Sequence, residues 1–259
     1  TGPAIALDAG NRIGNPPPMF PIRDHNPSGR TPYVTWALLT VNIAVFLLTW
    51  PFLETEYEAY LFFRAWGVVP EAVTQGADGH TLVTSMFLHG GWMHLAGNML
   101  FLFIFGDNME DVLGHLRFLG FYLLSGLAAA VLQIAADPAS PIPMVGASGA
   151  IAGVLGGYLL LFPRARVDVL IILIIFFRIL PVPAWIMLGL WFGLQIVGGL
   201  NTPSDAGGVA YWAHAGGFVA GLVLALPAWL ARGGPGFWAR TRGSPPHPEA
   251  RYPLVPTSV

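Results

Sequence analysis

The chain has 259 residues, of which 54% are hydrophobic and 10% are charged, and its formal net charge is -2. In soluble domains about a quarter of the residues are charged, so this composition indicates a protein that folds in lipid. The charge balance provides no basic patch for nucleic acid. The chain contains no cysteine, which excludes disulfides, a thiol nucleophile and thiolate metal ligands.

Both ends of the chain are rich in proline and polar residues. Such a composition cannot bury enough apolar surface to fold alone. We therefore expect residues 1–30 and 233–259 to be disordered cytoplasmic tails. Residues 31–232 should form one all-α polytopic membrane domain.

Six apolar runs approach or exceed the about 18 to 20 residues that cross a hydrocarbon core of about 30 Å. They lie near residues 33–52, 84–105, 116–136, 147–162, 183–200 and 209–231. We interpret them as six transmembrane helices. The apolar segment 167–180 is short, contains Arg178 and ends at two prolines, which stop a helix. We expect this segment to be interfacial or shallowly re-entrant.

Arginine placement predicts the orientation of these spans. With six spans both termini lie on one side, and that side holds 11 of the 12 basic residues, all of them arginines. The other side holds only Arg64. This asymmetry predicts cytoplasmic termini. A seventh span at 167–180 would remove the asymmetry, because it would move the arginines after residue 231 to the outer side. Composition and topology suit a bacterial inner membrane, with the fourth and sixth spans starting from the outer, periplasmic or extracellular, side.

A serine and a histidine stand out within the apolar runs. Ser148 lies in the motif Gly-Ala-Ser-Gly at residues 146–149, where a proline-rich loop turns into an apolar helix, and His214 lies in the last span. Polar groups inside a membrane are costly, so such a pair indicates a functional site. His214 lies roughly 10 Å below the start of its helix near Gly207. Ser148 can match that depth only if the loop 137–147 dips inward.

Small residues recur every four positions beside both side chains. On the fourth span they are Gly149, Gly153 and Gly157, and on the sixth they are Ala213, Gly217, Gly221 and Ala225. Such stripes let two helix backbones approach closely in lipid. Close packing of these spans would bring the Ser148 hydroxyl and the His214 imidazole together, whereas a serine alone beside glycines would be read as a packing residue.

The second span carries His89, His94 and Asn98. His94 and Asn98 are four residues apart and hence on one helical face, which suits an oxyanion hole completed by the backbone N–H of Ser148. The alternative is a structural His94 with Asn98 in a helix–helix hydrogen bond. For His89, a role in organising the loop and a role beside the catalytic group are equally compatible with the sequence.

A metal site built from His89, His94 and His214 was also considered. The five-residue gap between the first two histidines is poor for one helical face, and no carboxylate in the six runs completes a ligand set. Nor is there a buried acid for a third triad member, because Asp137 and Asp205 lie in loops. The sequence therefore indicates a Ser–His dyad that uses no metal and no cofactor.

At these residues the chain resembles the rhomboid family of intramembrane serine proteases, over about residues 33–231. The family pattern of His, four residues, His, three residues, Asn is met by His89, His94 and Asn98. Its Gly-x-Ser-Gly motif is met at residues 146–149. Its final Ala-His with spaced glycines is met at Ala213 and His214, followed by Gly217 and Gly221.

The resemblance implies that Ser148 is the nucleophile and His214 the base, with His94, Asn98 and the Ser148 N–H as the oxyanion hole. His89, Gly146, Gly149, Gly217 and Gly221 would support them. It further implies substrates that are single-span or polytopic membrane proteins in the lipid bilayer. They would be cut near the outer face next to a small residue, after entry between the second and fifth spans, with the loop after Asn201 as a lid.

The chain departs from the family pattern at two places. Many members have an aromatic residue four positions after the nucleophile to support the histidine ring, and here that residue is Ala152. We expect Trp212 or Phe218 to provide the support instead. Many members also carry a Trp-Arg pair in the first outer loop, where this chain has Arg-Ala-Trp at residues 64–66.

Two other classes of function were weighed against a protease. A catalytically inactive rhomboid-like protein that binds membrane clients would have no need of Ser148 together with His214. A channel or transporter would need polar residues spread across the depth of the membrane, whereas here they cluster toward one side. The sequence therefore favours an intramembrane serine endopeptidase.

Overall fold

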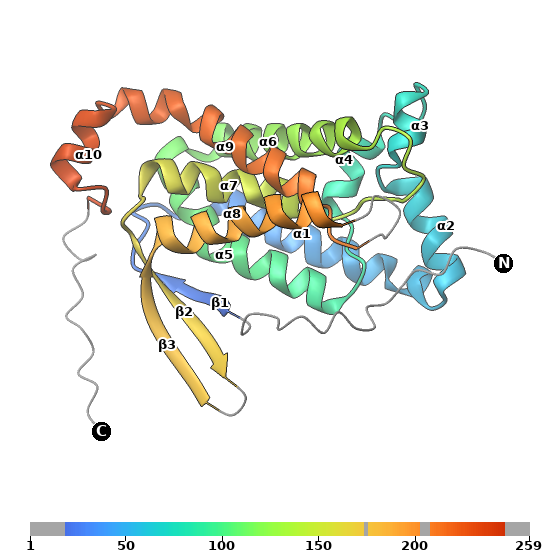
Figure 1. Ribbon diagram of the computed structural model, residues 1–259, viewed down its shortest axis with the longest axis horizontal. Helices are drawn as coiled ribbons and strands as arrows, with labels where there is room; N and C mark the ends of the chain where they lie inside the picture. Colours follow the sequence, from blue (N-terminus) through green and yellow to red (C-terminus); the bar gives the residue numbers. More distant parts are fainter. Residues whose placement is uncertain (1–18, 174–175, 203–207, 247–259) are drawn as a thin grey trace.

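The computed structural model of the protein describes residues 19–173, 176–202 and 208–246. The elements in chain order are β1 (Met19–Asp24), α1 (Tyr33–Thr49), the 3-10 helix η1 (Trp50–Leu53), α2 (Glu56–Trp66), α3 (Pro70–Thr74), α4 (Thr81–Thr84), the 3-10 helix η2 (Ser85–Phe87), α5 (Trp92–Leu113), α6 (His115–Ala136), α7 (Ser148–Leu161), β2 (Arg166–Leu173), β3 (Phe176–Pro183), α8 (Ala184–Asn201), α9 (Tyr211–Ala231) and α10 (Pro235–Thr241). The long helices run side by side, with α2 and α3 at one end and α10 at the other (Figure 1).

The long helices have the length and composition of membrane spans. In the described part of the chain, four helices are long and apolar enough to cross a bilayer: α1 continued by η1, α6, α8 and α9. The segment Thr81–Phe87 and α5 pass the same test together, although they meet at an angle of 91°. The protein is therefore a mostly helical polytopic membrane protein, as expected. The sixth expected span corresponds to α7, which has only 14 residues, so the count of six stays a prediction.

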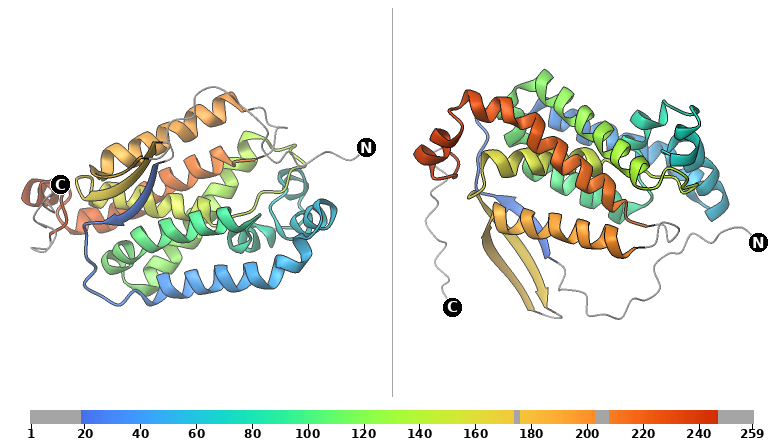
Figure 2. Two further views of the ribbon diagram at one scale, coloured as in Figure 1. Left: turned by 90° about the horizontal axis from the view of Figure 1, so that it is seen from below. Right: turned by 45° about the horizontal axis from the view of Figure 1, so that its top comes forward.

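The shortest of these helices, α7, lies at the centre of the molecule. Its residues from Gly149 to Tyr158 are all buried. Large apolar side chains are instead exposed on α1 and α8, among them Leu48 at 74% and Leu200 at 70%, and these two helices lie at opposite edges of the helical layer (Figure 2). Exposed apolar side chains on outer helices are the surface that lipid covers.

The second expected span, 84–105, is broken. The 3-10 helix η2 ends at Phe87 and α5 begins only at Trp92, because Gly90 and Gly91 are poor helix formers that lie between them. The helix then continues to Leu113 and includes Asp107, Glu110 and Asp111. These acids lie beyond the apolar run 84–105, in the last two turns of α5 and far along the helix from His94, so the expectation that no carboxylate in the runs completes a ligand set stays a prediction.

One of these acids, Glu110, holds the start of α1. Its carboxylate accepts hydrogen bonds from the backbone N–H groups of Val34 and Thr35, at 2.8 and 2.7 Å, and from the Thr35 hydroxyl at 2.7 Å. Pro32 at the start of α1 provides no side-chain cap. A carboxylate from α5 thus satisfies N–H groups that a helix N-terminus leaves without partners.

The segment 167–180 is extended rather than helical, and its expected place at the membrane interface stays a prediction. It forms most of β2 and β3, which pair antiparallel, with β1 on the other side of β2. The segment is rich in valine and isoleucine, which favour strands, and its prolines Pro181 and Pro183 lie in β3 at the edge of the sheet, where a missing N–H is tolerated. Because the hairpin returns the chain to the same end of the molecule, it adds no seventh span.

Both expected tails contain ordered structure. Residues 19–24 form β1, tied to β2 by the Arg23–Asp168 ion pair at 2.9 Å. Residues 235–241 form α10, where the Trp238 Nε1–H donates to Leu160 O at 3.0 Å. The expectation of disorder is wrong for these two stretches, because each finds a folded partner that composition alone does not reveal. Residues 1–18 and 247–259 lie outside the described residues.

Candidate active site

Ser148 and His214 are in hydrogen-bond contact. The distance from His214 Nε2 to Ser148 Oγ is 2.8 Å. Ser148 is the first residue of α7, and α9 begins at Tyr211 rather than near Gly207, so both side chains come from the first turn of their helices. The later start of α9 follows from Gly208, whose φ of +95° is incompatible with a right-handed helix. The expected depth of His214 below the start of its helix is therefore overestimated.

The small-residue stripes bring the two helices together. A Cβ added at Gly217 would collide with Gly149 O, and one added at Gly221 would collide with Gly153 O. The two backbones thus touch directly, as the spacing predicted. At Gly157 an added Cβ would lie 3.4 Å from Ala225 Cβ of α9, although Met109 and Phe121 are nearer to it.

The start of α9 is held from a third helix. The backbone N–H of Ala213 donates to Gln133 Oε1 of α6 at 3.0 Å. This bond satisfies one of the N–H groups that the first turn of a helix leaves unpaired. Because Ala213 precedes His214, the contact also holds the imidazole-bearing turn of α9 against α6.

The loop 137–147 is fastened to the loops around it. Met144 pairs with Val68 through two backbone hydrogen bonds, of 2.7 and 2.9 Å, and the Gly146 N–H donates to Ser85 O at 2.9 Å. These contacts hold the chain in place just before Ser148.

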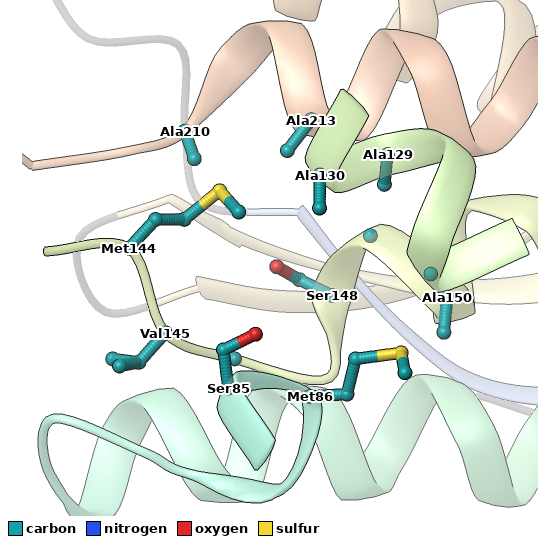
Figure 3. Close-up of a pocket in the computed structure, with 13 residues that line it drawn as sticks. Ser85, Met86, Ala129, Ala130, Met144, Val145, Ser148, Ala150, Ala210 and Ala213 are labelled. Atoms are coloured by element: carbon teal, nitrogen blue, oxygen red, sulfur yellow. The ribbon is translucent and has the colours of Figure 1, made fainter. Parts of the chain in front are cut away.

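A cavity of about 20 Å³ lies beside the Ser148 hydroxyl (Figure 3). Alanine side chains from α6 and α9, with Met144 and Ser85, surround it. The space is close to that of one water molecule. It therefore admits a small group next to the hydroxyl and excludes a bulky one.

His94 lies against the turn that carries Ser148. A Cβ on Gly146 would be 2.8 Å from His94 Nε2 and 3.5 Å from Ser148 Oγ. At the other side of the ring, His94 Nδ1 accepts a hydrogen bond from the Gly90 N–H at 3.4 Å. An accepting Nδ1 leaves the ring proton on Nε2, so a donor faces Gly146, two residues before Ser148.

Asn98 and His89 are both buried. Asn98 Nδ2 has no hydrogen-bond partner among the described residues, and the same holds for both ring nitrogens of His89. The His89 ring packs edge-on against His94 with 5.1 Å between ring centroids. A buried unpaired amide N–H suits a group that is satisfied only when a ligand or charge arrives. His89, which precedes α5, packs against the ring of His94.

Two residues of α8 complete the surroundings of His214, and the sequence analysis missed both. Gln195 Oε1 lies 2.8 Å from His214 Nδ1, and the Trp191 ring lies 5.7 Å from the His214 ring at an interplanar angle of 34°. The expectation of Trp212 or Phe218 is not met by direct ring contact: Trp212 lies against Gly199. Phe218 instead contacts Trp191, at 6.1 Å between centroids.

A sequence signal for Gln195 existed. It is the sole polar side chain in the run 183–200, and a polar residue in a transmembrane helix usually faces the protein interior and marks a function. Trp191 precedes it by four residues and therefore lies on the same helical face. No comparable signal marked Trp191 among the other aromatic residues of the apolar runs.

The arrangement has the parts needed for acyl transfer. A hydroxyl, an imidazole in contact with it and N–H donors beside it are gathered at one end of the helices. The acids of α5 and of β1 lie toward the other end, near the sheet.

A family model for the rhomboid domain matches residues 77–230. Rhomboid protein 1, mitochondrial, of Saccharomyces cerevisiae is 30% identical over 237 residues, which cover 85% of this chain and 60% of that protein. Rhomboid protease GluP of Bacillus subtilis is 33% identical over 163 residues, or 63% of this chain and 29% of that protein. The putative rhomboid protease YdcA of Bacillus subtilis is 29% identical over 124 residues, or 48% of this chain and 62% of that protein.

In each of these comparisons the chain spans less than two thirds of the length of its relative. The matched residues nevertheless include His89, His94, Asn98, Ser148, Gln195 and His214. The chain belongs to the rhomboid family.

Proposed function

We propose that this protein is an intramembrane serine endopeptidase that cleaves transmembrane segments with a Ser148–His214 dyad. The observation that carries the proposal is the 2.8 Å contact between Ser148 Oγ and His214 Nε2. The contact lies between α7, an apolar helix of 14 residues, and α9, whose length and apolarity suit a membrane span. Two relatives are named as a protease or putative protease, which supports the same class.

In the proposed reaction His214 Nε2 takes the hydroxyl proton while Ser148 Oγ attacks the carbonyl carbon of the scissile peptide. The resulting oxyanion is stabilised by the Ser148 N–H, His94 Nε2–H and Asn98 Nδ2–H. The imidazolium then gives its proton to the leaving amine, which releases the first product and leaves an acyl-enzyme. A water molecule, deprotonated by His214, hydrolyses the ester and restores the serine.

The unpaired state of Asn98 Nδ2 supports its role in this proposal. A buried N–H without a partner costs about 1–3 kcal/mol, and this cost is recovered only when an acceptor arrives. Donors that are already oriented toward the developing charge lower the barrier because they need no reorganisation.

The substrates we propose are membrane proteins, single-span or polytopic, cut next to a small residue. The cavity of about 20 Å³ beside Ser148 supports a small side chain at the cleavage site. A peptide bond in an intact helix has its carbonyl hydrogen-bonded within the helix, so local unwinding must precede attack. Residues that weaken helices near the cleavage site should therefore favour cleavage.

The test is cleavage of a single-span reporter in liposomes by wild type, Ser148→Ala and His214→Ala, with product masses measured. Both variants should lose activity by at least about 10³-fold. Matched controls are Ser125→Ala, which removes another buried serine, and His80→Ala in an outer loop, and both should cleave normally. Cleavage that survives Ser148→Ala would refute the dyad.

The alternative is a rhomboid-like protein that binds membrane clients without cutting them. A serine-reactive phosphonate probe distinguishes the two functions even when no substrate is known. Covalent labelling that depends on both Ser148 and His214 is expected for the protease. A folded wild-type protein that is never labelled would favour the client-binding function.

We propose that the termini lie on the cytoplasmic side and that the active site opens to the outer side. Arg64, at the end of α2, lies at the opposite end of the molecule from α10, which carries Arg240 (Figure 1). For the membrane itself, a yeast relative named mitochondrial weakens the expectation of a bacterial inner membrane. In a mitochondrion the arginine-rich side would be the matrix.

The absence of cysteine in the sequence makes the orientation simple to test. Gln75→Cys and Ala239→Cys each place one thiol at an exposed position, at opposite ends of the molecule. In intact bacterial cells an impermeant maleimide should label Gln75→Cys and leave Ala239→Cys unlabelled until the cells are opened. The reverse pattern would overturn the proposed topology.

A further inference from the structure

We infer that Gln195 is a positioning residue that sets the tautomer of His214, an inference that rests on the proposed protease function. Its amide oxygen lies 2.8 Å from His214 Nδ1, and its side chain is buried in α8. The base of the reaction lies between this amide and Ser148. The geometry thus gives the dyad a neutral third member from the fifth expected span.

The orientation of the Gln195 amide follows from its other end. Gln195 Nε2 lies 3.3 Å from the carbonyl oxygen of Trp191. A carbonyl oxygen can only accept, so the NH₂ group of the amide must face it. The amide oxygen is then the atom that faces His214.

The tautomer of His214 follows in turn. An amide oxygen can only accept, so His214 Nδ1 must carry the proton that is donated to it. In a neutral imidazole with a protonated Nδ1, the lone pair is on Nε2. Nε2 is the atom 2.8 Å from Ser148 Oγ, and only an unprotonated Nε2 can accept the hydroxyl proton.

Trp191 contributes to the same arrangement through its ring. It packs beside the His214 ring at 34°, while position 152, one turn after Ser148 in α7, carries only a methyl group. The amide and the ring both come from one face of α8. In this chain α8 therefore supplies the ring contact that α7 lacks and the acceptor for Nδ1.

The experiment compares Gln195→Met with Gln195→Glu. Methionine keeps the length of the side chain and removes the acceptor, whereas glutamate keeps an oxygen in the place of Oε1. We expect Gln195→Met to lower kcat roughly 10- to 100-fold with little change in KM. In the serine protease triad a wrong histidine tautomer lowers kcat roughly 10⁴-fold. We expect a smaller loss here, because the partner of His214 is a neutral amide rather than a charged carboxylate. Gln195→Glu should recover most of the lost rate.

The matched control is Leu194→Met, which introduces the same side chain at the neighbouring, exposed position of α8. It should leave kcat, KM and Tm unchanged. Thermal unfolding of each variant identifies a merely structural effect. If Gln195→Met fails to fold, Gln195→Leu removes the acceptor with another apolar side chain.

The outcomes separate this inference from the proposed function. If wild-type protein neither cleaves a reporter nor reacts with the phosphonate probe, the protease proposal is refuted. If wild type is active and Gln195→Met keeps a normal kcat, the positioning role is wrong while the dyad stands. A loss of rate that glutamate does not restore at all would also contradict it, because the acceptor would then not be the relevant property.

A pH profile gives a second readout. His94 of α5 and His89, which packs against it, are the other titratable side chains described at this site, while α7 and α8 contribute the Ser148 hydroxyl and the Gln195 amide. Removal of the acceptor in Gln195→Met should slow probe labelling across the whole profile, because the wrong tautomer is populated whenever the imidazole is neutral. A loss confined to one limb of the profile would contradict the tautomer mechanism.

Discussion

Gly146 and His94 are in direct contact, and the contact leaves no room for a side chain at position 146. The φ of Gly146 is +133°, and a Cβ there would lie 2.8 Å from His94 Nε2. Both facts require glycine, the first because L-residues rarely adopt such a φ and the second because a methyl group would push the imidazole away. The glycine of the motif thus lets the turn before Ser148 lie against the ring of His94.

Complete loss of an oxyanion donor costs about 2.7–4 kcal/mol. Gly146→Ala should displace the proposed donor His94 and therefore lower kcat/KM by at least about tenfold. Gly76→Ala is the matched control. Gly76 also has a positive φ, +82°, but nothing lies within 4 Å of its added Cβ. The control should show a small loss of Tm and normal catalysis. Equal catalytic losses in the two variants would refute the contact argument.

A second prediction concerns the packing of α7 against α9. Gly221→Ala would drive a methyl group into Gly153 O, and relief of that overlap must separate the helices that carry Ser148 and His214. Overpacking of this kind typically costs about 1–3 kcal/mol. We expect a lower Tm and reduced probe labelling. Gly193→Ala, where nothing lies within 4 Å of the added Cβ, should change neither.

A third prediction concerns the cap on α1. Glu110→Ala would leave the N–H groups of Val34 and Thr35 without the partner they have now, at an expected cost of about 1–3 kcal/mol. Thermal unfolding in detergent measures the loss. Glu56→Ala on the exposed first turn of α2 is the control and should have little effect. Because Glu110 lies far from Ser148, catalysis by the folded fraction of Glu110→Ala should stay normal.

The fourth prediction is a pH dependence of stability from Asp24, which lies in β1 outside the spans. Burial, together with the smaller effect of nearby Asp107, raises the pKa of Asp24 from 3.8 to about 8, against the hydrogen bond from Tyr158, which lowers it. A group whose pKa is higher in the folded state stabilises the fold fully below its ordinary pKa. That contribution is lost as the pH rises through about 8.

Compared with Asp24→Asn, wild type should therefore lose Tm progressively between about pH 4 and pH 8. Asp168→Asn is the control of opposite sign. Burial alone would raise the pKa of Asp168, but hydrogen bonds from His25 and Arg23 hold it below its ordinary value. The contribution of Asp168 is thus lost as the pH falls. Parallel profiles for wild type and Asp24→Asn would contradict the assignment to Asp24.

Local patterns in the sequence were sufficient for much of the site. The stripes of small residues on the fourth and sixth spans predicted that Ser148 and His214 meet, and the spacing of His94 and Asn98 placed both on one helical face. The structure agrees on these points, because side chains four residues apart on a helix share a face whatever surrounds them. The membrane class likewise followed from composition alone.

Other features depend on contacts between distant parts of the chain. The hairpin of β2 and β3 was misread because a short apolar run suits a strand, a buried helix or a re-entrant segment equally, and pairing with residues 19–24 decides among them. The break before α5 was missed because the apolar run continues through its two glycines. The hairpin thus depends on a contact remote in sequence, whereas the break follows from Gly90 and Gly91 themselves.

Composition and periodicity by themselves determined that this chain is a polytopic membrane protein in which the helices that carry Ser148 and His214 pack closely. Tertiary structure alone decided which side chain holds the other nitrogen of His214 and which ring lies beside it. A periodic pattern reports the face of a helix but not the rotation and height at which a neighbouring helix docks. That docking places Gln195 and Trp191 of α8 against α9 and supplies the contacts that Ala152 cannot make.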